Sequence, residues 1–423
     1  KVFVFIIDLP RNLNPKNFMQ LLDKNLNPSK DLIVNTDSNQ KTMYQNKNIE
    51  FGFKKFKSNS RNELLIIARY NAELKRSVAE IIDLKTLQVI FTYLPDIDKI
   101  NSLTDTTREE FKNLLVDQSL ERYRIVHPYI EDDGSLIFQS ESPLVKINLC
   151  NKILWVNDDN KYHHSIEKDL NDNFIVPVHI FPFDYKKEII GERYESFFDD
   201  GIARVSNHGK TLYEKSVAQI FEENGLRNLL FSYSRFENDP LHLNDIEEAK
   251  TDTLYWKKGD LFLSLRNISA VVHYRPETNK ILKVIRGKFS LQHDIDIIND
   301  HSISIFNNNA YNTYQGNKHL GKFNEIVVYD FKNDKFYSNK REVFEKYKIK
   351  TMNGGLVEYF DDGSILADTQ DQGRIVLIDK NGLIEWEFNN IYNNNSYFVS
   401  WSRLIKNQEK VTKIKNAIKN KKC

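Results

Sequence analysis

Gln292-His293-Asp294-Ile295-Asp296 opens the stretch of the chain that decides its fold. It continues through Ile297-Ile298-Asn299-Asp300 into Ser302-Ile303-Ser304-Ile305-Phe306. Two short runs of alternating apolar and polar residues on either side of a polar turn are typical of paired β-strands. A histidine stands where the first of these strands begins.

The same layout recurs twice upstream. His164-Ser165-Ile166-Glu167 leads through a polar turn into Phe174-Ile175-Val176. His242 precedes Asn244-Asp245-Ile246-Glu247, which leads after an insertion into Leu261-Phe262-Leu263-Ser264-Leu265. Three histidines at the same place in three copies of one unit indicate a repeat architecture.

Short strands fill the chain from about residue 60 onward in six units. The units begin near Leu64, Ser135, Phe174, Leu261, Ser302 and Ser364. This repetition predicts an all-β fold, a six-bladed β-propeller of four-stranded antiparallel blades. We expect the left-over strand Tyr397–Trp401 to complete the first blade, because pairing the two ends removes an exposed sheet edge.

Three regions follow from this pattern. Residues 1–58 are rich in Asn, Lys, Asp and Ser and predict a polar, loosely packed N-terminal arm. Residues 59–405 form the expected propeller and catalytic domain. Residues 406–423 form a basic tail, which we expect to be a solvated end. Helices are expected only over 107–117, over 215–223 and in the tail.

Composition limits the choice of partners. Basic residues number 60 and acidic residues 59, so the net charge of +1 gives no reason to expect nucleic acid as a partner. The two cysteines, Cys150 and Cys423, cannot form a disulfide framework, and their spacing suits no zinc site. We expect Cys150 to be unpaired. The run Val2–Ile7 is too short to cross a bilayer, and it fits the trailing end of a signal or anchor as well as an ordinary strand.

The repeat places the histidines together. The innermost strand of each propeller blade lines the central channel, so His164, His242 and His293 should converge at one mouth. His127 holds a similar place ahead of Asp132-Asp133-Gly134 in a fourth unit. A single histidine is more simply structural, whereas a set at one register favours a functional site.

Two chemistries suit such a ring. Imidazoles bind transition metals, but the nearest carboxylates stand two or more residues along each strand, so we expect no metal and no cofactor. Arg266 ends the strand Leu261–Leu265 and should face the channel, where a guanidinium binds sulfate or phosphate oxygens. Neutral imidazole is a nucleophile and protonated imidazole a general acid, which favours transfer of a charged group through a covalent histidine.

Several motifs in order resemble the bacterial arylsulfotransferases. They are Tyr162-His163-His164-Ser165-Ile166-Glu167, His242-Leu243-Asn244-Asp245, Leu261 to Ser269, Tyr274-Arg275-Pro276-Glu277-Thr278-Asn279-Lys280, Gln292-His293-Asp294 and Phe306-Asn307-Asn308-Asn309. The resemblance spans roughly residues 60–405 and is densest over 124–310.

The resemblance implies a sulfotransferase that moves a sulfuryl group from an aryl sulfate ester to a phenolic acceptor, without a nucleotide sulfate donor. His293 then corresponds to the nucleophile that becomes a sulfohistidine, and Arg266 to the group that stabilises the sulfuryl oxygens. His164 and His242 correspond to the sulfate-binding and proton-transferring histidines. We expect the substrate-binding residues to include Asn244, His163 and His127.

Other functions stay open at this stage. A non-catalytic propeller that binds an anionic ligand or a protein partner is the alternative, and a plain sulfatase is a third option. We expect an exported or periplasmic protein, membrane-anchored if residues ahead of Lys1 supply the anchor. The sequence leaves the oligomeric state open.

Overall fold

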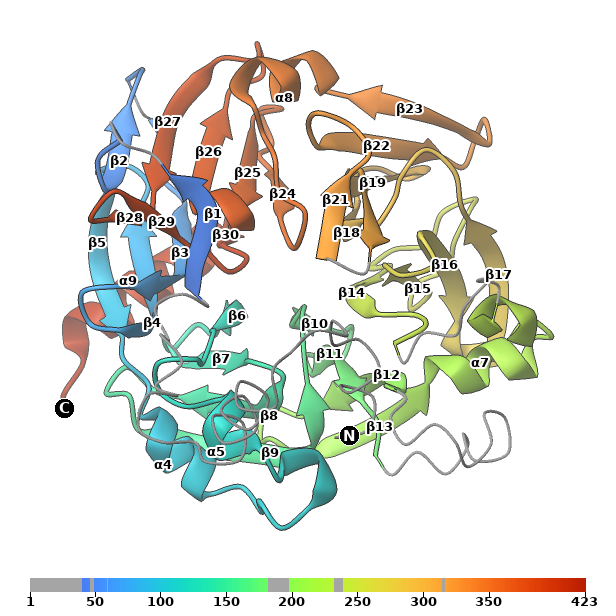
Figure 1. Cartoon of the computed structure of the whole chain (residues 1–423), viewed down its shortest axis with the longest axis horizontal. Coiled ribbons are helices and arrows are strands. Elements are labelled where there is room, and N and C mark those ends of the chain that lie inside the picture. Colours follow the sequence, from blue (N-terminus) through green and yellow to red (C-terminus); the bar gives the residue numbers. More distant parts are fainter. Residues whose placement is uncertain (1–39, 46–48, 59, 182–197, 232–238, 314–315) are drawn as a thin grey trace, which may run out of the picture.

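The computed structural model describes residues 40–45, 49–58, 60–181, 198–231, 239–313 and 316–423. These residues form an all-β fold of antiparallel sheets, which Figure 1 shows arranged around a common centre. None of the helices in these ranges has the length and apolar character needed to span a bilayer.

The sheets follow one another along the chain. The first contains β30 (Arg403–Ile405), β3 (Leu64–Asn71), β4 (Arg76–Asp83) and β5 (Gln88–Tyr93). An eight-stranded sheet joins β6 (Val126–Ile130), β7 (Leu136–Gln139), β8 (Ser142–Ile147) and β9 (Ile153–Tyr162) to β10 (Glu167–Lys168), β11 (Phe174–His179), β12 (Asp200–Val205) and β13 (Thr211–Ser216).

Three further sheets complete the succession. One contains β14 (Leu243–Glu248), β15 (Leu261–Leu265), β16 (Ala270–Arg275) and β17 (Lys280–Ile285). The next contains β18 (His293–Ile297), β19 (Ser302–Asn307), β22 (Glu325–Asp330) and β23 (Lys335–Asn339). The last contains β24 (Leu356–Tyr359), β25 (Ile365–Thr369), β26 (Arg374–Ile378), β27 (Ile384–Asn389) and β2 (Gly52–Lys55).

Smaller elements connect the sheets. Two short pairings are formed by β20 (Ala310–Thr313) with β21 (Gly316–His319), and by β1 (Lys41–Gln45) with β29 (Asn395–Tyr397) and β28 (Ile391–Tyr392). The α-helices are α4 (Ile97–Ser102), α5 (Leu114–Asp117), α7 (Val217–Glu223), α8 (Arg341–Tyr347) and α9 (Gln408–Asn420). Single 3₁₀ turns lie at η1 (Glu109–Phe111), η2 (Arg227–Phe231), η3 (Pro276–Thr278) and η4 (Gln370–Gln372).

The middle strands of the sheets are apolar on both faces because neighbouring sheets cover them. Leu64 to Ala68 of β3, for example, have no exposed surface at all. Their side chains alternate between two separate clusters, one shared with β6 to β8 and the other with β25 to β27. A sheet buried on both faces therefore reads as a continuous apolar run in the sequence.

Buried carboxylates connect each sheet to the next near the centre. A carboxylate oxygen of one sheet accepts a backbone N–H of its neighbour. The pairs are Asp200 with Leu243 (2.9 Å), Asp245 with Ile295 (2.7 Å), Asp294 with Val357 (2.8 Å) and Asp368 with Ser402 (2.8 Å). Buried hydrogen bonds of this kind fix the relative register of the inner strands, which carry the site described below.

The C-terminal strand that pairs with β3 differs from the predicted one. Arg403–Ile405 forms the ladder with Leu64–Ile66. The predicted strand Tyr397–Trp401 meets β3 through an isolated bridge between Val399 and Arg69, which is flanked by backbone hydrogen bonds from Tyr70 to Phe398 and from Ser400 to Ala68. The backbone of Trp401 is left-handed, with φ of 54°. The ladder with β3 is interrupted at that residue and resumes at Arg403.

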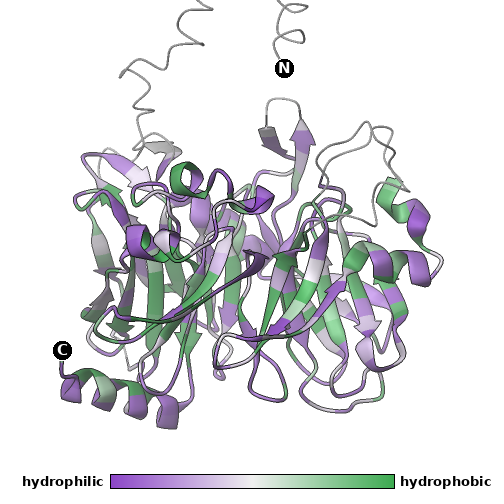
Figure 2. Cartoon of the chain, turned by 90° about the horizontal axis from the view of Figure 1, so that it is seen from below, coloured by the Kyte–Doolittle hydropathy of each residue, from purple (hydrophilic) through white to green (hydrophobic). Residues whose placement is uncertain are grey.

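The tail is bound to the body of the protein, contrary to the prediction of a solvated end. Helix α9 buries Val411 and Ile414 in the same apolar cluster as β3 to β5, and it lies across one end of the sheets in Figure 2. Cys423 forms a disulfide with Cys150, with Cα atoms 5.5 Å apart. The expectation that Cys150 is unpaired was wrong because nothing in the sequence shows that residue 423 returns to the loop after β8.

The N-terminal arm lies largely outside the described residues, which include its residues 40–45 and 49–58. Strand β2 extends the sheet of β24 to β27, and the ring of Phe53 contacts Trp386 with 5.2 Å between ring centroids. Gln40 reaches the centre of the molecule, where its amide donates to the carbonyl of Arg122 at 2.9 Å. The prediction of a loosely packed arm was therefore wrong for residues 40–45 and 52–55.

Candidate active site

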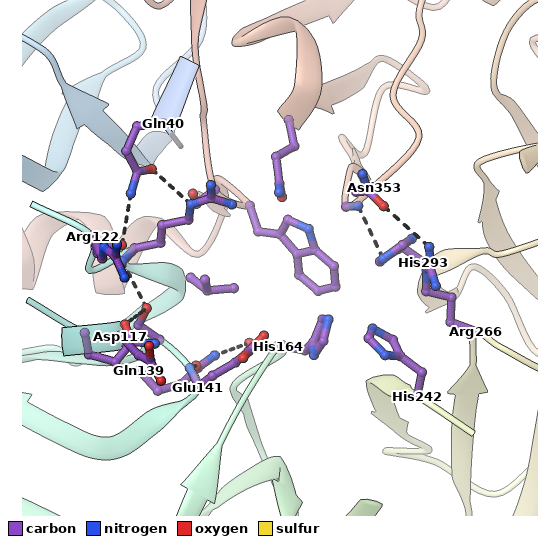
Figure 3. A pocket seen from close by; sticks show the side chains of 18 of the residues that line it. Gln40, Asp117, Arg122, Gln139, Glu141, His164, His242, Arg266, His293 and Asn353 are labelled. Carbon is purple, nitrogen blue, oxygen red and sulfur yellow. Dashed lines mark hydrogen bonds between the residues drawn. The ribbon is translucent and has the colours of Figure 1, made fainter. Parts of the chain in front are cut away.

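A cavity of about 720 Å³ opens at the centre of the sheets. His164, His242, Arg266 and His293 line it, as Figure 3 shows, so the four residues predicted to carry the chemistry lie in one place. Its other walls come from distant parts of the chain, namely Gln40, Asp117, Gln118, Arg122, Arg124, Val126, residues 139–141, Asn317, Asn353, Gly354, Gln370, Ser400 and Trp401.

The histidine rings are close to one another. The centroid of the His164 ring lies 5.0 Å from that of His242 and 6.4 Å from that of His293. The indole of Trp401 lies against two of them, 6.0 Å from His164 and 5.9 Å from His293. Trp401 therefore places an apolar surface beside the polar groups of the cavity, a role that the sequence analysis missed.

A left-handed backbone conformation recurs where the inner strands begin. The residues in that conformation are Trp401 (φ 54°), His127 (40°), His164 (57°), His242 (56°), Asp294 (53°) and Gly354 (59°). Non-glycine residues rarely adopt such angles, and each costs of the order of 1–3 kcal/mol. The same strained conformation thus recurs at the inner strands, where His164, His242 and Trp401 reach the cavity and His127 and Asp294 do not.

His293 is held in one tautomer. The side-chain nitrogen of Asn308 donates to the carbonyls of Gly354 (2.8 Å) and Thr351 (3.3 Å), so its oxygen faces His293. That oxygen lies 2.7 Å from Nδ1 of His293 and can only accept, so Nδ1 carries the proton. Nε2 keeps its lone pair, and the N–H of Gly354 approaches it at 3.3 Å.

Burial, and after it the positive charge of Arg266, hold the pKa of His293 well below its usual value of 6.5. The imidazole is therefore neutral at neutral pH, which is the form that can attack. Burial also lowers the pKa of His164 well below that value, and the neighbouring His242 and His163 add to the effect.

His242 is shifted in the opposite direction. Burial by itself would lower its pKa, but the Asp239 carboxylate, hydrogen-bonded to Nδ1, outweighs it and raises the pKa above 6.5. The charges of Arg266 and Asp200 act on it more weakly and in opposite directions. Two imidazoles pushed apart in pKa at one site suit a base or nucleophile beside an acid.

Arg266 is oriented by amide side chains. Nη1 donates to Asn267 at 2.7 Å and Nη2 reaches Asn353 at 3.4 Å. Burial lowers the pKa of this guanidinium from its usual 12.5. An arginine in this position can bind an oxyanion in the cavity through its remaining N–H groups.

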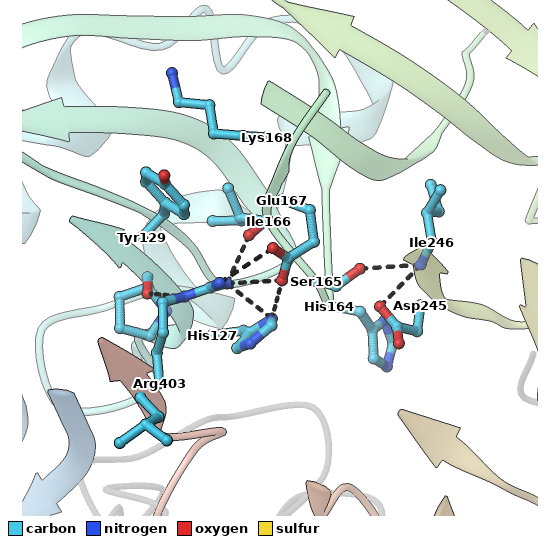
Figure 4. A network of polar contacts seen from close by, with 12 residues as sticks. His127, Tyr129, His164, Ser165, Ile166, Glu167, Lys168, Asp245, Ile246 and Arg403 are labelled. Atoms are coloured by element: carbon cyan, nitrogen blue, oxygen red, sulfur yellow. Dashed lines mark hydrogen bonds and ion pairs between the residues drawn. The ribbon is translucent and has the colours of Figure 1, made fainter. Parts of the chain in front are cut away.

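The three residues predicted to bind substrate lie behind the cavity wall. Asn244 donates to the carbonyl of Gln292 at 2.8 Å, next to His293. His127 packs its ring 5.2 Å from Trp401 and contacts Arg403, as Figure 4 shows. His163 places Nδ1 2.7 Å from Nδ1 of His164. Each of the three therefore contacts a residue of the cavity or, for Asn244, the chain neighbour of His293.

Some functional residues escaped the sequence analysis. Asn308 lies in the quoted run Phe306-Asn307-Asn308-Asn309, but the run alone does not show which amide turns inward. Asp239 stands three residues before His242, a spacing that could have suggested a partner. The pair Gly354-Gly355 is the other usable signal, because a Cβ at Gly354 would lie 2.1 Å from Gln370 and 2.9 Å from Trp401.

Solved structures resemble this chain at low identity. A protein of unknown function from Bacteroides caccae is 11% identical, with a TM-score of 0.51 over 82% of this chain and 100% of the other. Virginiamycin B lyase from Staphylococcus aureus is 13% identical, with a TM-score of 0.36 over 64% of this chain and 71% of the other. The Pan2 WD40 domain of Neurospora crassa is 10% identical, with a TM-score of 0.42 over 78% of this chain and 76% of the other. The first of these supports the fold alone.

No curated protein sequence matches the chain. The profile of the arylsulfotransferase (ASST) family, in contrast, matches residues 127–391, which include His164, His242, Arg266 and His293. This span is more than half of the chain and supports an arylsulfotransferase-type function in general. The chain therefore belongs to the arylsulfotransferase (ASST) family.

Proposed function

We propose that the protein transfers a sulfuryl group from an aryl sulfate ester to a phenol through a covalent intermediate on Nε2 of His293. The observation that carries this proposal is the fixed tautomer of His293. Its Nε2 lone pair, which the N–H of Gly354 approaches at 3.3 Å, lies in a cavity shared with Arg266 and two further histidines. An attacking imidazole needs that lone pair and needs room for a tetrahedral sulfuryl group beside it.

In the first half-reaction Nε2 of His293 attacks sulfur, and the bond from sulfur to the phenolic oxygen breaks. The departing phenolate takes the proton of His242, whose raised pKa keeps it charged as an acid. The sulfurylated imidazole ring becomes positive while Nδ1 still donates to Asn308. Arg266 and His164 face the sulfuryl oxygens.

In the second half-reaction a phenolic acceptor occupies the place that the first product left. His242, now neutral, takes the acceptor's proton as its oxygen attacks sulfur, and the bond between Nε2 of His293 and sulfur breaks. Atoms and charge balance, because the proton given to the leaving phenol is replaced by one from the acceptor. Asp239 holds His242 in place through both steps.

We also propose that the sheets form the six blades of a closed propeller. The antiparallel sheets around one centre, and the pairing of C-terminal β30 with N-terminal β3, support this arrangement. In such a ring, strands from different blades bring His164, His242 and His293 to one axis.

The test is release of 4-nitrophenol from its sulfate ester, with and without added phenol. We expect phenol to accelerate release, and His293→Ala to abolish both the release and a sulfuryl adduct detected on His293 by mass spectrometry. His301→Ala, which changes a histidine in a turn outside the cavity, is the matched control. Normal turnover in His293→Ala would refute the mechanism, release indifferent to phenol would indicate a sulfatase, and binding without turnover would indicate a non-catalytic propeller.

A further inference from the structure

A second group of side chains lies directly behind His164. His163 follows β9, His179 ends β11 and Asp200 begins β12, and the last two are opposite one another in the ladder. The Oδ1 atom of Asp200 lies 3.4 Å from Nε2 of His163 and 3.4 Å from Nδ1 of His179. All three atoms lie within 4.8 Å of one another, and among the described residues this is the one such cluster.

These three atoms are buried and lack hydrogen-bond partners. Nε2 of His163, Nδ1 of His179 and Oδ1 of Asp200 have no donor or acceptor at hydrogen-bonding geometry. His163 and Asp200 are almost fully buried, with 2% and 1% of their surface exposed. The other Asp200 oxygen is occupied, since it accepts the backbone N–H of Leu243. Buried polar atoms without partners are costly, and three that lie within 4.8 Å of one another suit a shared ligand.

We propose that His163, His179 and Asp200 bind one divalent transition-metal ion of the zinc class. Tetrahedral coordination with bonds of about 2.0–2.1 Å separates neighbouring ligand atoms by about 3.3 Å. The two distances of 3.4 Å to Asp200 match that spacing. Two imidazoles and a carboxylate are a ligand set that zinc and related ions accept, with a fourth position left for water.

The ion has a consequence for the neighbouring active site. A metal-bound imidazole carries its proton on the other ring nitrogen, so Nδ1 of His163 becomes the donor toward Nδ1 of His164, 2.7 Å away. His164 must then carry its own proton on Nε2, which can donate to an oxygen of the sulfuryl group. Without the ion the bond can run the opposite way and leave a lone pair on Nε2 of His164. This second step depends on the proposed sulfuryl transfer, whereas metal binding does not.

Metal content tests the first step. The full chain is dialysed against Zn²⁺, exchanged into metal-free buffer and measured by elemental analysis, and we expect about one zinc ion per chain. We expect His179→Ala to bind zinc at least about tenfold more weakly. His208→Ala, which changes an exposed histidine in a turn beside β13, should bind like the parent chain. Titration of the unmodified protein with Co²⁺, followed by its visible absorption, needs no variant and so covers a failure to fold. No zinc and no Co²⁺ absorption would overturn the proposal.

The second step, the proton relay to His164, is tested by removing the metal from the parent chain and from His164→Ala. Removing zinc with a chelator should slow aryl sulfate turnover about tenfold or more, with the melting temperature measured on the same sample. In His164→Ala the same treatment should change the residual rate little, because the ion acts through that ring. Equal losses in both proteins would refute the proton relay and leave metal binding intact. An inactive parent protein that still binds zinc would refute the sulfotransferase and not the metal site.

Discussion

Apart from His293 itself, Asn308 is the residue on which the proposed chemistry depends most directly. Its oxygen accepts the Nδ1 proton of His293 at 2.7 Å, and both side chains are buried. Asn308→Ala leaves that N–H without a partner, which costs about 1–3 kcal/mol. If the whole loss falls on the transition state, it corresponds to a rate about 5- to 150-fold lower, since about 1.36 kcal/mol is tenfold.

The assay is the first turnover of 4-nitrophenyl sulfate, followed by rapid mixing at saturating substrate. Asn308 also donates to Gly354, so the melting temperature of the variant is measured alongside. Asn307→Ala is the matched control, because this buried amide accepts the N–H groups of Ser290 (2.9 Å) and Asn309 (2.8 Å) and lies apart from His293. We expect both variants to lose stability and only Asn308→Ala to lose the first-turnover rate. A rate within twofold of the parent, or an equal fall in the control, would contradict the assigned tautomer.

Three further outcomes are expected. The first half-reaction needs neutral His293, whose pKa is lowered, and protonated His242, whose pKa is raised, so its rate should show a plateau that includes pH 6.5. The rate should fall in acid as His293 is protonated and in alkali as His242 loses its proton, and a single midpoint at 6.5 would contradict the assignment. Arg266→Lys keeps the charge but loses the paired donors, so steady-state turnover should fall by about 100-fold, whereas a change under threefold would remove arginine from the charge-stabilising role. Cys150→Ser opens the disulfide to Cys423 and should lower the free energy of unfolding by about 2–4 kcal/mol in guanidinium denaturation, while an unchanged midpoint would show that α9 docks without it.

The sequence predicted the strands, and it predicted that His164, His242, Arg266 and His293 lie together, because both depend on local patterns. Runs such as Leu261–Leu265 are apolar over their whole length, and a strand buried on both faces has this composition wherever it lies. The histidines could be aligned because each stands at or just before an inner strand, but they do not share one register. His293 is the first residue of β18, His242 stands one residue before β14 and His164 stands three residues before β10.

What the sequence did not show depends on contacts between remote residues or on backbone angles. The Cys150–Cys423 disulfide joins positions 273 apart. Trp401 was predicted to lie within a strand, since nothing local marks its left-handed conformation. The pairing of His179 with Asp200 across β11 and β12 escaped for the same reason, because the loop between them hides their opposition in the ladder.

The left-handed residues at the inner strands separate backbone shape from chemical identity. Tryptophan, histidine, aspartate and glycine all occupy that position in different sheets, on one local conformation. The cost of holding the angle is met by the surrounding sheets and not by the side chain that happens to be there. The chemistry that each sheet brings to the centre is thus decided by which side chain stands on a shared backbone shape, except at Gly354, where neighbouring side chains leave no room for a Cβ.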